Sequence, residues 1–222
     1  MKSILTTLAI IMATTLSFGQ ITEGKVEYDL KFSSSNAEVA AQLSMVQGSK
    51  LVQAFSAEGT RTEMNMGMIQ STTTIKNNKE KKSISLLGGM MGYKAMINDF
   101  ESTAEAKEND LIVEKTNETK TILGIVCTKH VIDLGPETGM LELYLTEEII
   151  PATKVDNQFI PTDVTGFPLE FSLTTSDMTI TSTAVKIAKV LKKDEKKELF
   201  STKIPSGYEL MKKEELFESF MD

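Results

Sequence analysis

Charged and apolar residues alternate strictly in the stretch Lys25-Val26-Glu27-Tyr28-Asp29-Leu30-Lys31-Phe32. A period of two residues is typical of a β-strand, in which successive side chains point to opposite faces of the sheet. One face of this strand would be apolar and the other charged, the pattern of an antiparallel sheet with one buried and one solvated face. The stretch therefore predicts a half-buried antiparallel strand.

Strand signals continue through most of the chain. Between residues 50 and 98, segments of about five to nine residues are separated by glycine or asparagine turns, which predicts a meander. Further strands are expected at 111–116, 121–132, 140–146 and from residue 167 onward. The apolar parity changes between Ile180 and Val185, which predicts a bulge near residues 181–183. Because bent strands curve a sheet, we expect a mainly β fold, a curved antiparallel sheet that forms a half-open barrel.

Two helices are expected beside this sheet. Ser35-Asn36-Ala37-Glu38 has the pattern of a capping box, and the helix it begins, near 36–47, is expected to cover part of the sheet. A short C-terminal helix is expected to dock through Leu216, Phe217 and Phe220.

Three stretches are expected to be loops. The lysine-rich stretches 76–82 and 189–197 also contain acidic or amide residues, which predicts solvated loops. The stretch 147–166 contains Pro151 and Pro161, which interrupt ladder hydrogen bonding. Because long loops in compact domains often line a binding site, we expect this one near a ligand entrance.

The amino terminus has the pattern of a signal peptide. Lys2 precedes an apolar stretch at 4–16, and Ser17-Phe18-Gly19 offers the small residues that signal peptidase requires. We expect cleavage near Gly19-Gln20, a signal peptide at 1–19 and a single β-rich domain at 20–222. The apolar stretch is shorter than the roughly 20 residues of a membrane-spanning helix, so we expect a periplasmic or secreted protein without a transmembrane segment.

Charge and cysteine content narrow the partners and the fold. The formal net charge of −7 disfavours binding to nucleic acid or to anionic lipid head groups. The chain has one cysteine, Cys127, which is either a buried apolar filler or an intermolecular thiol. Ile125 and Val131 share its predicted strand face, which favours burial.

The residues needed for common catalytic sites are missing from the sequence. His130 is the single histidine, and neither a Gly-x-Ser-x-Gly elbow nor a phosphate-binding glycine pattern is present. Glu147 and Glu148 are adjacent, so on a strand their side chains would point to opposite faces. Cys127 and His130 would also face opposite ways. We therefore expect a non-catalytic protein without a cofactor.

Methionine is unusually frequent, with 13 residues in the chain. Met64, Met66 and Met68 alternate along one predicted strand face, and Met90, Met91 and Met96 follow two strands later. Three interpretations are open: methionines that fill a curved core, methionines that line an adaptable apolar cavity, or thioethers that bind copper(I) or silver through Met64, Met66 and Met68. The candidate cavity consists of Met64, Met66, Met68, Leu86, Met90, Tyr93 and Met96.

Four motifs resemble a secreted bacterial family, domain-of-unknown-function family 4412. They are the stretches from Thr121 to Lys129 and from Leu143 to Ile149, Gly166-Phe167-Pro168-Leu169-Glu170, and Ile204-Pro205-Ser206-Gly207-Tyr208. The resemblance implies a sheet curved around a cavity, similar to LolA and LolB, the half-barrel carriers that shield acyl chains of lipoproteins. No catalytic or binding residues are established for this family, so the resemblance assigns none.

These observations lead to one expected function and two alternatives. The first expectation is an exported binding protein that holds a lipid, an acyl chain or a lipidated peptide in an apolar cavity of the half-barrel. The second is a copper(I)- or silver-binding envelope protein that uses the methionine cluster. The third is a structural or adaptor domain of the cell envelope that has no ligand and binds an unknown protein partner.

Overall fold

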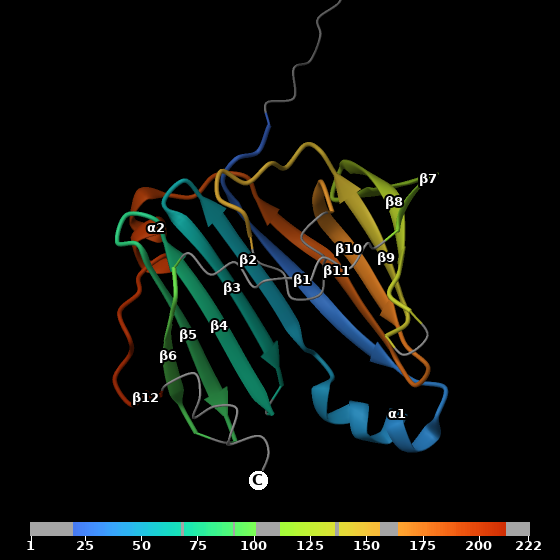
Figure 1. The fold of residues 1–222 in the computed structure, drawn as a ribbon, viewed down its shortest axis with the longest axis horizontal. Coiled ribbons are helices and arrows are strands. Elements are labelled where there is room, and N and C mark those ends of the chain that lie inside the picture. Colours follow the sequence, from blue (N-terminus) through green and yellow to red (C-terminus); the bar gives the residue numbers. More distant parts are fainter. Residues whose placement is uncertain are drawn as a thin grey trace, which may run out of the picture.

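The computed structural model describes residues 20–67, 69–90, 92–100, 112–135, 138–155 and 164–211. One 12-stranded sheet has the strand order β12-β6-β5-β4-β3-β2-β1-β11-β10-β9-β8-β7. The strands are β1 (Gly24–Ser33), β2 (Lys50–Ser56), β3 (Gly59–Met66), β4 (Gln70–Asn77), β5 (Lys82–Gly89), β6 (Lys94–Asn98), β7 (Val113–Ile122), β8 (Ile125–Asp133), β9 (Met140–Thr146), β10 (Phe167–Thr174), β11 (Thr179–Ala188) and β12 (Glu209–Leu210). The predicted mainly β fold with a curved, half-open sheet is confirmed (Figure 1).

The antiparallel pairing of β1 with β11 joins two meanders. Strands β1 to β6 form one half of the sheet, and β7 to β11 form the other. The two joining strands pair from Lys25 opposite Ala188 to Ser33 opposite Thr179. Strands β7 and β12 stand at opposite ends of the strand order, so the sheet is not closed into a barrel.

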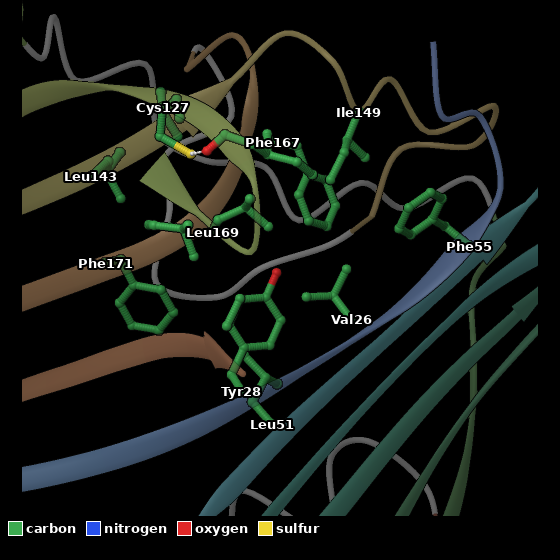
Figure 2. Packing of buried hydrophobic residues seen from close by; sticks show 14 of the residues in the cluster. Val26, Tyr28, Leu51, Phe55, Cys127, Leu143, Ile149, Phe167, Leu169 and Phe171 are labelled. Carbon is green, nitrogen blue, oxygen red and sulfur yellow. Dashed lines mark hydrogen bonds between the residues drawn. The ribbon is translucent and has the colours of Figure 1, made fainter. Parts of the chain in front are cut away.

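The main hydrophobic core lies between the two halves of the sheet. Figure 2 shows Val26 and Tyr28 of β1 pointing toward Leu169 and Phe171 of β10. All four side chains are almost completely buried. Since side chains from both halves meet here, this is the concave face of the sheet.

Tyr28 makes both apolar and polar contacts in this core. Its hydroxyl lies 2.9 Å from the backbone oxygen of Pro168 and 3.2 Å from Oε1 of Gln53. Burial raises the pKa of Tyr28 well above its ordinary value, because the charged phenolate would lose its hydration. The neutral hydroxyl therefore connects β1 to β2 and to β10 at the centre of the core.

A second layer covers the convex face of β2 to β6. Helix α2 (Lys193–Leu199) and the segment 200–211 follow β11, and Phe200 packs against Ala54. Nδ2 of Asn77 donates a hydrogen bond of 2.8 Å to the backbone oxygen of Phe200. The prediction of a solvated loop at 189–197 is therefore wrong for residues 193–197, which belong to helix α2. Buried apolar residues that flank the lysines, Leu191 and Phe200, hold this short helix on the sheet.

Helix α1 (Ala37–Leu43) and the 3₁₀ turn η1 (Ser44–Val46) cross one end of the sheet (Figure 1). The predicted capping box marks the start of the helix to within one residue, but the N-cap is Asn36 rather than Ser35, and the Asn36 side chain accepts from the backbone N–H groups of Glu38 and Val39. None of the residues of α1 is buried, so the helix does not cover the sheet as predicted. Instead, Ser34 donates to the backbone oxygen of Asp177, which places the start of this crossing beside the β10–β11 turn.

The segment 147–155 crosses the opposite end of the sheet. Ile21 and Ile149 form a parallel bridge, and Thr153 donates a 2.9 Å hydrogen bond to the backbone oxygen of Ser56. Nδ2 of Asn78 donates to the Thr153 hydroxyl at 2.7 Å. The predicted loop 147–166 is thus anchored to the β2–β3 and β4–β5 turns, while residues 156–163 lie outside the described part of the chain.

Two predicted strand features differ in position. The strand expected at 121–132 is interrupted by a two-residue turn at Leu123-Gly124, where both residues have positive φ, 51° and 80°. The bulge expected near 181–183 lies at Val185, since Glu27 pairs with Lys186 while Tyr28 pairs with Ala184. In both places, alternation identified the strand but not the residue at which the hydrogen-bond ladder is interrupted.

The predicted C-terminal helix at Leu216, Phe217 and Phe220 lies outside the described residues, as does the predicted signal peptide at 1–19. Among the residues that the structure describes, no helix has the length and apolar character needed to span a membrane.

The β7–β8 turn provides a test of local strain. Leu123 has φ of 51° and is 43% exposed, and an L-residue in this conformation costs about 1–2 kcal/mol. Asparagine tolerates it, and Asn-Gly is the preferred two-residue hairpin turn. We expect Leu123→Asn to raise the free energy of unfolding by about 0.5–1 kcal/mol in urea denaturation. Gly124→Ala is the opposite control. It should lower the free energy of unfolding, because alanine does not readily adopt the φ of 80° found at Gly124. If both substitutions stabilised the chain, this turn geometry would be contradicted.

Candidate functional site

The unbroken register from β2 to β6 determines which side chains share the concave face. Directly opposite residues of antiparallel strands lie on the same face. We call each row of directly opposite residues across these strands a level. In the first level, Leu51 of the main core pairs with Met64 of β3, and the row continues through Thr72 to Leu87 of β5. The next level contains Thr62, Thr74, Ser85 and Met96, and the one after it contains Thr60, Lys76, Ser83 and Asn98.

This part of the concave face has a polar end and an end with some apolar side chains. At the polar end, Nδ2 of Asn98 donates to Oγ of Ser85 at 2.8 Å, and Ser85 lies 3.4 Å from the hydroxyl of Thr74. At the end nearer α1, the face presents Met66 and Leu87 beside the polar side chains of Gln70, Thr72 and Lys94. Both groups are half-buried, in contrast with the fully buried core on the other half of the same face.

The structure brings only some of the predicted cavity residues together. Met64, Met66 and Met96 share the concave face, although Met64 and Met66 also pack on the main core. Met90 is 80% exposed, and Tyr93 is 58% exposed with its ring 5.3 Å from that of Tyr208. Met68 lies outside the described residues.

Leu86 lies on the opposite, convex face. It packs with Ile75, Ile84 and Ala95 beneath Ile204 and Tyr208. Its neighbour Leu87 occupies the concave position instead. Sequence reasoning missed Leu87 because Leu86 and Leu87 are both apolar, so alternation does not show which of them lies on the concave face.

The methionine metal site stays a prediction. Met64 and Met66 lie on one side of β3, as a pair of thioether ligands would require. Met64 is only 7% exposed and belongs to the main core, so metal binding there would compete with packing. In the described part of the chain, no group of three or more histidine, cysteine or carboxylate residues could hold a metal ion.

A separate pocket of about 540 Å³ lies beside the segment 147–155. Its lining residues are Gln20, Lys115, Val126, Thr128, His130, Leu145, Thr146, Glu147, Glu148, Thr165 and Gly166. Nδ1 of His130 lies 3.1 Å from the backbone oxygen of Thr128. Sequence reasoning noted Glu147, Glu148 and His130 separately but did not bring them together, because it predicted one strand over 121–132, across the β7–β8 turn, and placed Glu147 and Glu148 on opposite faces.

Cys127 is completely buried, as predicted. Burial is the main reason why its pKa rises from 9.0 to about 11, and the nearby carboxylates Glu148 and Glu170 add to the shift. Figure 2 shows the thiol directed into the core beside Phe167 and Leu169, whereas His130 lines the pocket. Cys127 and His130 therefore belong to different environments and do not form a metal-binding pair.

Comparisons with known proteins give no family assignment. No protein-family model matches the chain, and no characterised protein matches it either. Two solved structures of PNGF-II, in space groups C2 and P21, are similar at 15% identity with TM-scores of 0.46 and 0.47. The alignments cover 89% and 90% of this chain but only 32% and 33% of the PNGF-II chains. A similarity of this degree carries no functional argument, and the resemblance to family 4412 stays a prediction.

The raised thiol pKa predicts a loss of stability at alkaline pH. The folded chain keeps the Cys127 proton up to about pH 11, whereas the unfolded chain releases it near its ordinary pKa of 9.0. The stabilisation is therefore fully present below pH 9 and is lost as the pH rises toward 11, by at most about 3 kcal/mol. We expect the free energy of unfolding, measured by urea denaturation across this pH window, to fall more steeply in the wild-type chain than in Cys127→Ala. Parallel curves would contradict a buried, protonated thiol.

Proposed function

We propose that this chain is an exported, non-catalytic binding protein that holds a lipid, an acyl chain or a lipidated peptide on the concave face of its half-open sheet. The observation that carries this proposal is that the concave face has two parts of different burial. One half is a filled apolar core, while the surface on β3 to β6 remains half-buried, with Met66 and Leu87 among polar side chains at one end and hydroxyl, amide and lysine side chains at the other. An amphipathic molecule matches such a surface.

The division of the face also gives the orientation of the ligand. An acyl chain would lie against Met66 and Leu87, near α1, where contact removes apolar surface from water at about 25 cal/mol per Å². The polar part would lie against Thr74, Ser85 and Asn98, whose hydroxyl and amide groups can still form hydrogen bonds. The unbranched methionine side chain would adapt to acyl chains of different shape.

Charge placed on the concave face tests this proposal. The chain is exported with its own signal peptide, purified without detergent, and titrated with the apolar fluorescent probe N-phenyl-1-naphthylamine. We expect Leu87→Asp to weaken probe binding by about tenfold or more, since a carboxylate would oppose apolar contact. Ile97→Asp is the matched control, because Ile97 is 55% exposed on the convex face of β6. Thermal unfolding verifies that both variants fold.

Native mass spectrometry of the same preparation separates the three functional classes. An added mass of lipid size supports the carrier and identifies its ligand class. A mass equal to one or two copper ions would replace the carrier with the methionine metal site. The third outcome is a bare chain that either does not bind the probe or binds it equally weakly in both variants. This outcome would contradict a ligand on this face and favour the structural adaptor.

A further inference from the structure

The pocket beside the segment 147–155 carries charges of opposite sign on two walls. Lys115 of β7 pairs across the strands with His130 of β8, so both side chains lie at one end of the pocket. Glu147 and Glu148 follow the end of β9 and line its other end. Within the described residues, neither the Lys115 ammonium nor these two carboxylates have an ion-pair partner. The charges are therefore available to a ligand.

The strand register gives the separation between the two walls. His130 pairs with Leu143, and Glu147 lies four residues further along the chain. At a rise of about 3.3 Å per residue, the backbone positions that carry the two charged ends are about 13 Å apart along the strand direction. A free amino acid is too short to reach both ends. An extended peptide of about four residues spans this distance.

The middle of the pocket suits a peptide backbone. Val126, 56% exposed, and Leu145 provide an apolar surface that one side chain could contact. Hydroxyl groups of Thr128 and Thr165 line the same space and can form hydrogen bonds with peptide groups, whereas the buried Thr146 hydroxyl accepts from the backbone N–H of Glu148 at 3.2 Å. The volume of about 540 Å³ is also within the range of small-ligand sites, about 300–1,000 Å³.

We propose that this pocket binds the free termini of a short peptide of about four residues in an extended conformation. The α-ammonium group of the peptide binds Glu147 and Glu148, and its α-carboxylate binds Lys115 and His130. Hydrogen bonds between charged partners are stronger than neutral ones, so the two termini determine both orientation and length. This site is distinct from the concave surface on β3 to β6, and its test does not depend on the proposed lipid ligand.

Calorimetric titration with three tetrapeptides tests the recognition of both termini. The probes are tetra-alanine, its N-acetylated form and its C-terminal amide. We expect each blocked form to bind about tenfold more weakly than tetra-alanine, because each loses one charge-assisted contact. Free alanine should bind more weakly still. Equal affinity for alanine and tetra-alanine, or no binding of tetra-alanine at millimolar concentration, would overturn the proposal.

Two sets of substitutions assign each terminus to its wall. Lys115→Gln should abolish the preference for the free carboxylate and keep the preference for the free ammonium group. The pair Glu147→Gln and Glu148→Gln should have the opposite effect. Lys120→Gln is the matched control, since Lys120 is on the same strand but pairs with Glu170 at 2.7 Å. A uniform loss of affinity in both sets, with folding intact, would contradict recognition of the two termini.

Discussion

The pairing of β1 with β11 is the constraint on which the rest of the structure depends. Each meander is built from local hairpins, but only this ladder, between residues more than 140 positions apart, makes them one sheet. Tyr28 sits at its centre, opposite Ala184, where the small partner leaves room for the aromatic ring. Its hydroxyl, 2.9 Å from the backbone oxygen of Pro168, also ties β1 to β10. The bulge at Val185 adds twist at the same place, and the sheet curves around the buried ring.

This curvature explains why the two candidate sites lie where they do. Because the sheet is curved but not closed, β1 and β2 fill their concave face against β8 to β10, while none of the described strands opposes β4 to β6 in this way. Their concave face is left half-buried, and their apolar residues on the other side are covered by α2 and the segment 200–211. At the far edge, the β7–β8 hairpin extends past the end of β9, and the pocket forms where the chain crosses from Thr146 toward Ser56.

The sequence was informative wherever one feature decided the structure. Strict alternation predicted β1, the capping-box pattern at residues 35–38 predicted the start of α1 to within one residue, and the apolar neighbours of Cys127 predicted its burial. Prediction from the sequence failed where two different structures are compatible with the same pattern of residues. Leu86 and Leu87 are both apolar although, among the described residues, only the convex face of β5 is covered, so alternation does not reveal which of the two lies on the concave face. The pocket was not predicted, because it depends on a hairpin turn in which a leucine adopts positive φ.

Among the described residues, the groups with shifted pKa values lie in the core or in side-chain hydrogen bonds nearer the surface. Burial raises the pKa values of Tyr28 and Cys127, and both groups lie in the core. On the surface, a hydrogen bond from Tyr144 lowers the pKa of Glu118, and a hydrogen bond to Glu142 raises that of Lys129. Enzymes gather such perturbed groups in a cleft, where they transfer protons or attack a substrate. Here the shifts follow from packing and from cross-strand ion pairs, which hold the curved sheet in shape. The curved sheet fixes the shape and the charge pattern that a ligand of the proposed carrier would have to complement.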